Sequence, residues 1–138
     1  MIRLSKQVEY TIEFLLALGR KQPGEILSVK IFSGESNISY LFLQRIALRL
    51  KAAGIITAVR GTKGGYILQK PIEQISLREV YEVVEGRYGS VACQKGKECK
   101  HEATCNLKNH FDVFQEKILN YMENIPLQNF YVSSTSKK

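Results

Sequence analysis

The sequence has no tryptophan, only three prolines and three cysteines among its 138 residues, and no long apolar run. A membrane-spanning helix needs about 20 consecutive apolar residues, so we do not expect an integral membrane protein. Glu9 and Glu13 interrupt the N-terminal region, where a signal peptide needs a continuous apolar core. We therefore expect a cytoplasmic protein. The odd number of cysteines argues against a disulfide scaffold.

The composition that is present is typical of a single globular domain, with 44% apolar and 24% charged residues. The net charge of +7 is unevenly distributed. Residues 1–70 carry 11 basic and 4 acidic side chains, whereas residues 71–138 carry 9 of each, so the whole excess lies in the first half. Clustered positive charge favours a nucleic-acid partner, because neutralising phosphates drives affinity. A solvated surface without a partner would give the same pattern.

Apolar residues recur at helical spacing in the first half of the chain. Ser5 is a suitable N-cap for the first helix, and Gly54 a suitable residue to follow the third. In the third helix Leu43, Ile46 and Leu50 predict the face that packs on the core. The expected helices cover residues 5–20, residues 29–35, and a stretch that begins after Asn37 or Ser39 and ends near Ala53.

A β-hairpin is expected after the third helix. Residues 55–59 are rich in β-branched side chains, residues 66–68 form a second short run, and the basic, glycine-rich segment RGTKGG joins them. Helix, short helix, helix and hairpin is the order of a winged helix-turn-helix. There the third helix enters the major groove and the wing contacts the flanking backbone or minor groove. The segment lacks the pattern of a nucleotide-binding phosphate loop.

The candidate DNA-binding side chains lie on the third helix and in the wing. Arg45 lies roughly opposite the core face, where its guanidinium could match the two acceptors of guanine. If Arg45 and Arg49 were only solvated surface residues, the helix would show the same pattern. The basic hairpin expected next to this helix favours DNA binding. The candidate set is Ser39, Tyr40, Gln44, Arg45, Arg49, Arg60, Thr62 and Lys63.

Two further helices are expected in the second half, on either side of a segment without periodicity. The first covers residues 76–85, with Ser76 and Glu79 as a capping box. The second carries apolar residues at alternating spacings of four and three, as in a coiled-coil seam. Such a seam predicts a homodimer and hence a palindromic DNA site, although a helix packed on its own core would show it too. The seam residues are Leu107, Phe111, Phe114, Ile118, Tyr121 and Ile125.

The segment between these helices carries all three cysteines, Cys93, Cys99 and Cys105, with five residues between successive cysteines and several lysines nearby. Basic neighbours favour the thiolate, which is the form that binds metal. Three sulfur ligands suit an iron–sulfur cluster. Redox-active thiols are a second interpretation. Zinc is a third, although zinc sites usually have closer cysteine pairs and four ligands from one chain.

Taken in order, these motifs resemble the Rrf-two family of bacterial transcription regulators, which includes IscR-like and NsrR-like branches. The resemblance covers most of residues 1–130 and rests on FLQRI at 42–46, RGTKGGY at 60–66 and the three spaced cysteines. It implies a homodimeric winged-helix regulator whose iron–sulfur cluster alters promoter affinity. In IscR-like members the cluster is of the two-iron type and senses cluster supply, and in NsrR-like members it senses nitric oxide. We therefore expect [2Fe-2S] in preference to [4Fe-4S].

The resemblance also bears on the fourth cluster ligand. IscR-like members have a histidine three residues after the last cysteine, but this chain has Lys108, and a protonated lysine cannot ligate iron. NsrR-like members use an acidic residue from the N-terminal helix of the partner subunit, and the matching position is Glu9. His101, between the second and third cysteines, is the alternative ligand. Glu9 would otherwise be a surface residue that the helix dipole favours.

The sequence therefore predicts a mainly α-helical winged helix-turn-helix with a small hairpin wing and a long C-terminal dimerisation helix. We expect a homodimeric DNA-binding transcriptional regulator, not an enzyme and with no membrane partner, that senses iron–sulfur status, nitric oxide or redox state. A metal-free thiol switch and a small electron-transfer protein are the alternatives, and the sign of regulation is open. The expected regions are residues 1–70 for DNA binding, 71–105 for the connecting helix and cluster loop, 106–130 for dimerisation, and 131–138 as a disordered tail.

Overall fold

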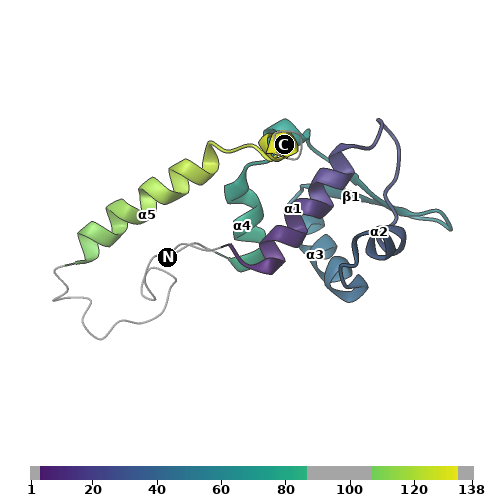
Figure 1. The fold of residues 1–138 in the computed structure, drawn as a ribbon, viewed down its shortest axis with the longest axis horizontal. Coiled ribbons are helices and arrows are strands. Elements are labelled where there is room, and N and C mark those ends of the chain that lie inside the picture. The colour runs from purple at the N-terminus through teal and green to yellow at the C-terminus, as the bar shows by residue number, and fades with distance from the viewer. Residues whose placement is uncertain (1–3, 87–106, 134–138) are drawn as a thin grey trace.

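The computed structural model describes residues 4–86 and 107–133, and the three cysteines and His101 lie outside these residues. Helices α1, α2, α3 and the hairpin gather at one end of the molecule, while α5 extends away at the other (Figure 1). This arrangement confirms the predicted mainly helical winged-helix class. The elements are α1 (Lys6–Gly19), α2 (Val29–Ser36), α3 (Tyr40–Ala52), β1 (Ile56–Val59), β2 (Gly65–Leu68), the 3-10 helix η1 (Ile72–Gln74), α4 (Leu77–Glu85), α5 (Lys108–Glu123) and α6 (Asn129–Ser133).

Short polar caps set the boundaries of the helix-turn-helix. The hydroxyls of Ser5, Ser28 and Ser39 each accept a hydrogen bond from the backbone N–H three residues further on. Asn37 ends α2 in the left-handed conformation, with φ 62°, and Gly54 follows α3 with φ 78°. The turn that sets α3 against α2 is therefore specified by residues within a few positions of it.

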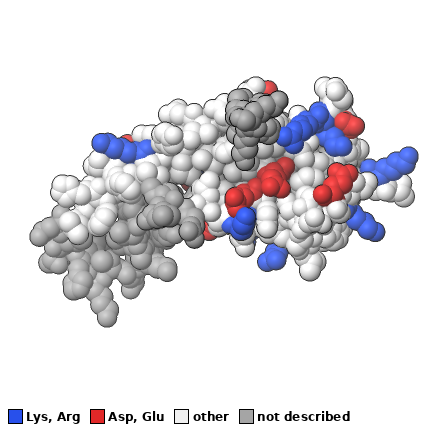
Figure 2. All heavy atoms as spheres, viewed as in Figure 1, with Lys and Arg blue, Asp and Glu red and all other residues white. Residues whose placement is uncertain are grey.

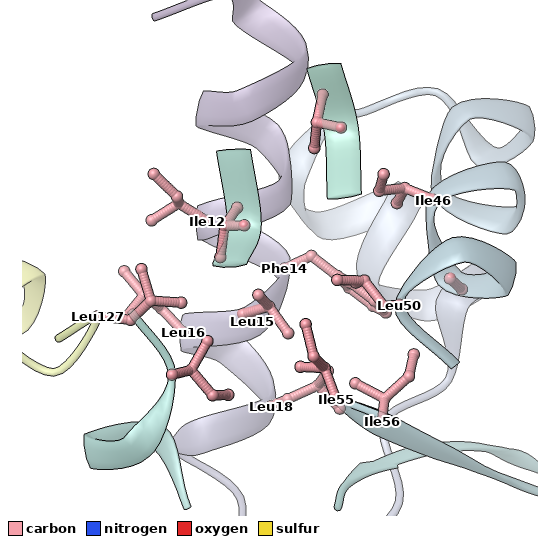
Figure 3. Close-up of a cluster of buried hydrophobic side chains, with 14 of the residues drawn as sticks. Ile12, Phe14, Leu15, Leu16, Leu18, Ile46, Leu50, Ile55, Ile56 and Leu127 are labelled. Atoms are coloured by element: carbon pink, nitrogen blue, oxygen red, sulfur yellow. The ribbon is translucent and has the colours of Figure 1, made fainter. Parts of the chain in front are cut away.

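The hydrophobic core lies where α1, α3 and the hairpin meet, and Figure 3 shows its central side chains. Leu43, Ile46 and Leu50 of α3 are buried, as their spacing predicts. On α1 the burial is wider than one stripe, because Phe14 and Leu18 are buried as well. Burying side chains of this size contributes about 1.5–3 kcal/mol each, so this core holds α3 at a fixed angle to the rest of the module.

The hairpin also pairs with a segment outside its two strands. β1 pairs antiparallel with β2, from Ile56 opposite Leu68 to Val59 opposite Gly65. Leu27, in the α1–α2 connection, adds a bridge on the other edge of β2 through two 3.0 Å hydrogen bonds with Tyr66. The wing is thereby tied to the segment that leads into α2.

The chain after α5 returns to the core. Leu77 N–H donates to the carbonyl of Ile125, and Leu127 N–H donates to the carbonyl of Ile75, both at 2.8 Å. In α6, the Tyr131 hydroxyl donates to the carbonyl of Leu16 at 2.7 Å. Helix α6 thus includes residues 131–133 of the expected tail, and residues 134–138 lie outside the described part.

The predicted capping box of α4 is present only in part. Ser76 caps the helix by accepting from Glu79 N–H at 3.2 Å. The Glu79 carboxylate instead accepts two hydrogen bonds from Lys70, at 2.9 and 3.1 Å. This pair joins α4 to the chain that follows the wing.

Candidate nucleic-acid interface

The outer face of α3 carries polar side chains that are exposed to solvent. Gln44 and Arg45 are exposed, on the side of the helix away from buried Leu43 and Leu50. Gln44 Nε2 donates to the Tyr40 hydroxyl at 2.9 Å, which holds the amide against the helix. Ser39, the fourth candidate here, is exposed and caps the helix. The structure therefore brings these predicted residues together on one surface.

Arg49, the last candidate on α3, has a structural contact. Its Nη1 donates to the carbonyl of Val84 at 3.2 Å, near the C-terminal end of α4. Spacing alone could not indicate this contact, because the two residues are 35 positions apart. Arg49 therefore links α3 to α4, the helix that precedes the cysteine segment. Its contact with DNA remains a prediction.

The wing presents a second basic group. Arg60, Thr62 and Lys63 are exposed in the turn between β1 and β2, where Gly61 adopts φ 127°. Figure 2 shows Lys and Arg side chains around the end of the molecule that carries the helix-turn-helix and the wing. Among the described residues, Arg45, Arg60 and Lys63 take part in no ion pair. Their charges are therefore available to phosphates.

A different surface lies along α5. Leu107, Phe114 and Tyr121, spaced by seven residues, are exposed, and Tyr121 is 70% exposed. Phe111 and Ile118 between them are half-buried. A helix that leaves one apolar side chain per two turns in solvent presents a seam that its own subunit does not cover. We call the three exposed members of the predicted seam, Leu107, Phe114 and Tyr121, the α5 seam.

The candidate ligand Glu9 lies on the first turn of α1 and is exposed. Its carboxylate pairs with Lys6 Nζ at 3.2 Å, and this hydrogen bond and charge raise the pKa of the lysine. One turn earlier, the Ser5 hydroxyl donates to the carboxylate of Glu85, the last residue of α4. The start of α1 thus adjoins the point where the described chain stops before the cysteines.

A capped helix-turn-helix with unpaired cations on its third helix and a basic hairpin beside it defines a winged-helix DNA-binding protein. The chain belongs to the Rrf2 family, whose model, described as an iron-dependent transcriptional regulator, matches residues 4–132. It is therefore a DNA-binding transcriptional regulator and not an enzyme. Within residues 4–86 and 107–133, no helix has the length and apolar character needed to cross a membrane.

Three relatives place the chain within this family. It is 37% identical over 86 residues to IscR of Cereibacter sphaeroides, covering 61% of this chain and 56% of the relative. It is 28% identical to NsrR of Bacillus subtilis, covering 88% and 82% of the two chains. The crystal structure of the oxidized form of CymR from Staphylococcus aureus is similar with a TM-score of 0.66 and 27% identity, covering 91% of this chain and 93% of that one.

Arg45 and Arg60 are expected to contribute to DNA affinity in different ways. Arg45→Ala should weaken operator binding by about 1–3 kcal/mol and relax sequence preference, because an exposed guanidinium on the third helix of a winged helix can reach base edges. Arg60→Ala should weaken binding of specific and non-specific duplexes to a similar extent, because a contact from the wing to phosphates would carry no sequence information. Binding measured at several salt concentrations separates the two effects. Normal operator binding by both variants would show that these elements are not the interface.

Proposed function

We propose that the chain is a cytoplasmic homodimeric regulator whose affinity for a palindromic promoter site is controlled by an iron–sulfur cluster on Cys93, Cys99 and Cys105, with [2Fe-2S] the expected type. The observation that carries this proposal is the set of three cysteines between α4 and the α5 seam, in a chain of a family described as iron-dependent regulators. The cysteines thus lie in sequence between the DNA-reading module and the helix we assign to dimerisation.

The donor set fits such a group. Three thiolates are soft ligands, and the lysines near them in the sequence favour the thiolate form. We propose Glu9 of the partner subunit as the fourth ligand, with His101 as the alternative. In support, the Glu9 carboxylate is exposed and is paired only with a flexible surface lysine among the described ion pairs. Such exposed pairs contribute little, so ligation would not have to overcome a strong bond.

When bound, the cluster would supply a centre that responds to oxidants, nitric oxide or iron supply. The chain's own contacts offer a route from that centre to DNA. Val84, near the end of α4, accepts a hydrogen bond from Arg49 of α3, and Glu85 next to it accepts one from Ser5 of α1. A displacement of the end of α4 would therefore act on α1 and α3 of the DNA-binding module.

A second candidate is a thiol switch without metal. The specific observation in its favour is the similarity to the crystal structure of an oxidized form of CymR. Here the cysteines themselves would be oxidised and reduced, and the rest of the mechanism would be shared. The electron-transfer alternative is set aside, because the chain belongs to a family of transcriptional regulators.

The cluster proposal predicts that anaerobically reconstituted protein binds iron and sulfide and absorbs visible light. Cys99→Ala should lose the bound iron and sulfide and the visible absorption, because two thiolates cannot hold the cluster. Glu9→Ala should retain the cluster but lose it faster in oxygen. Glu13→Ala is the matched control, since Glu13 is also exposed and lies one turn further along α1.

Three outcomes would contradict or redirect this proposal. A colourless, iron-free protein whose operator binding ignores oxidants would refute control by the cysteines. An iron-free protein whose binding changes with thiol oxidation would establish the thiol switch. An unchanged cluster in Glu9→Ala, beside a perturbed one in His101→Ala, would move the fourth ligand to the cysteine segment.

A further inference from the structure

Two leucines are exposed on the face of α3 that carries the candidate DNA-binding residues Gln44 and Arg45. Leu41 is 69% exposed and Leu48 is 61% exposed, whereas Leu43 and Leu50 on the same helix are fully buried. Spacings of three and four residues place Leu41 and Leu48 on one helix face with Gln44 and Arg45. The candidate base-reading surface is therefore half apolar, which the DNA-binding prediction from charge did not take into account.

The surroundings of Leu41 indicate what covers it. No acidic residue lies within α3, and exposed Arg45 is one turn away from Leu41. A protein partner would have to supply both an apolar surface and an acidic side chain for that cation, because burying it alone is costly. The major groove of DNA provides the two acceptors of guanine for the arginine, and it also holds one apolar group, the 5-methyl of thymine.

The position of Leu41 along the helix supports the same occupant. The helix begins at Tyr40 under the Ser39 cap, so Leu41 lies in the first turn. The N-terminal residues of a recognition helix are those that reach the base edges. Leu48 lies seven residues later, about 10 Å further along the helix axis, and so further from the bases.

We propose that Leu41 is a specificity-determining residue that contacts the 5-methyl group of a thymine in each operator half-site. The inference rests on the DNA-binding function and adds an apolar contact to it. Gln44 lies one turn further on, with its amide held by Tyr40, and an amide is suited to adenine. The half-site should therefore contain an A·T pair under the first turn of α3, next to the guanine read by Arg45.

The test replaces thymine by uracil, which removes the methyl group and retains base pairing. The full-length protein first selects a duplex from a random pool, and each thymine of the selected site is then changed to uracil in turn. One position per half-site should weaken binding about fourfold, the value of one buried methyl-sized group. Leu41→Ala should bind the thymine site about as weakly and should show no further loss with uracil.

Leu48→Ala is the matched control, because it removes an equally exposed leucine from the same face. It should keep the fourfold sensitivity to uracil, so the double-mutant comparison isolates Leu41 from any change in DNA shape. Equal binding of thymine and uracil sites by the unmodified protein would overturn the inference, as would a Leu41→Ala protein that remains sensitive. Failure to select any duplex would instead overturn the DNA-binding assignment itself.

Discussion

Phe114→Glu is expected to convert the proposed dimer into a monomer and to lower operator affinity by at least about a hundredfold. Phe114 occupies the middle of the α5 seam and is 44% exposed in the single subunit. Burying a phenylalanine contributes roughly 1.5–3 kcal/mol, and two-fold symmetry counts each substitution twice. A buried carboxylate without a partner adds a further penalty. Light scattering and operator binding at the same protein concentration measure both effects.

Val113→Glu provides the control for this experiment. Val113 is exposed on α5 to a similar degree, but it lies outside the seven-residue spacing of the seam. It should remain dimeric and bind the operator normally, because its side chain points to another face of the helix. A stable dimer in Phe114→Glu would show that the seam serves its own subunit only, and the palindromic operator would lose its structural basis.

The features that could be predicted from the sequence are those fixed by residues close together in it. Ser5 and Ser39 each accept a bond from an N–H three residues away, so their capping role is contained in the sequence of one turn. The burial of Leu43, Ile46 and Leu50 follows from helical period alone. These two kinds of information were enough for the helix order and hence for the winged-helix class.

The features that could not be predicted join residues far apart. Periodicity says which face of a helix is buried but not which element covers it. The Arg49–Val84 contact, the bridge between Leu27 and Tyr66, and the docking of Tyr131 on α1 therefore had no local signal. For α6 the signal was also short, because five residues give little more than one turn of helical pattern.

Some features of the candidate DNA-binding site could also be predicted from the sequence, and others were missed. The exposed positions of Gln44 and Arg45 follow from their places opposite the core face of α3. The exposure of Leu41 follows from the same helical geometry, although an apolar side chain taken by itself suggests burial. The buried leucines could have provided a signal, since Leu43 and Leu50 already fill the core face and leave Leu41 outside it.

Gly65→Ala is expected to lower the free energy of unfolding by about 3 kcal/mol and to weaken operator binding through the wing. A methyl group on Gly65 would overlap the carbonyl oxygen of Leu27, which accepts the 3.0 Å hydrogen bond from Tyr66. The overlapping atom is backbone, so no side-chain rotation relieves it. Either the contact is strained by overpacking, or the Leu27 segment separates from β2 and loses two backbone hydrogen bonds.

Gly34→Ala is the matched control, because the same change is expected to have the opposite sign there. Gly34 lies within α2, and a methyl group on it would meet no atom within 4 Å apart from its chain neighbours and the backbone of its own helix. Alanine in a helix is favoured over glycine by about 0.5–1 kcal/mol, so this variant should be slightly more stable. Thermal unfolding should show Gly65→Ala melting about 10 °C lower and Gly34→Ala a few degrees higher. Equal stability of the two variants would mean that the wing is not anchored to the α1–α2 connection, and α3 and the wing would then contact DNA as independent elements.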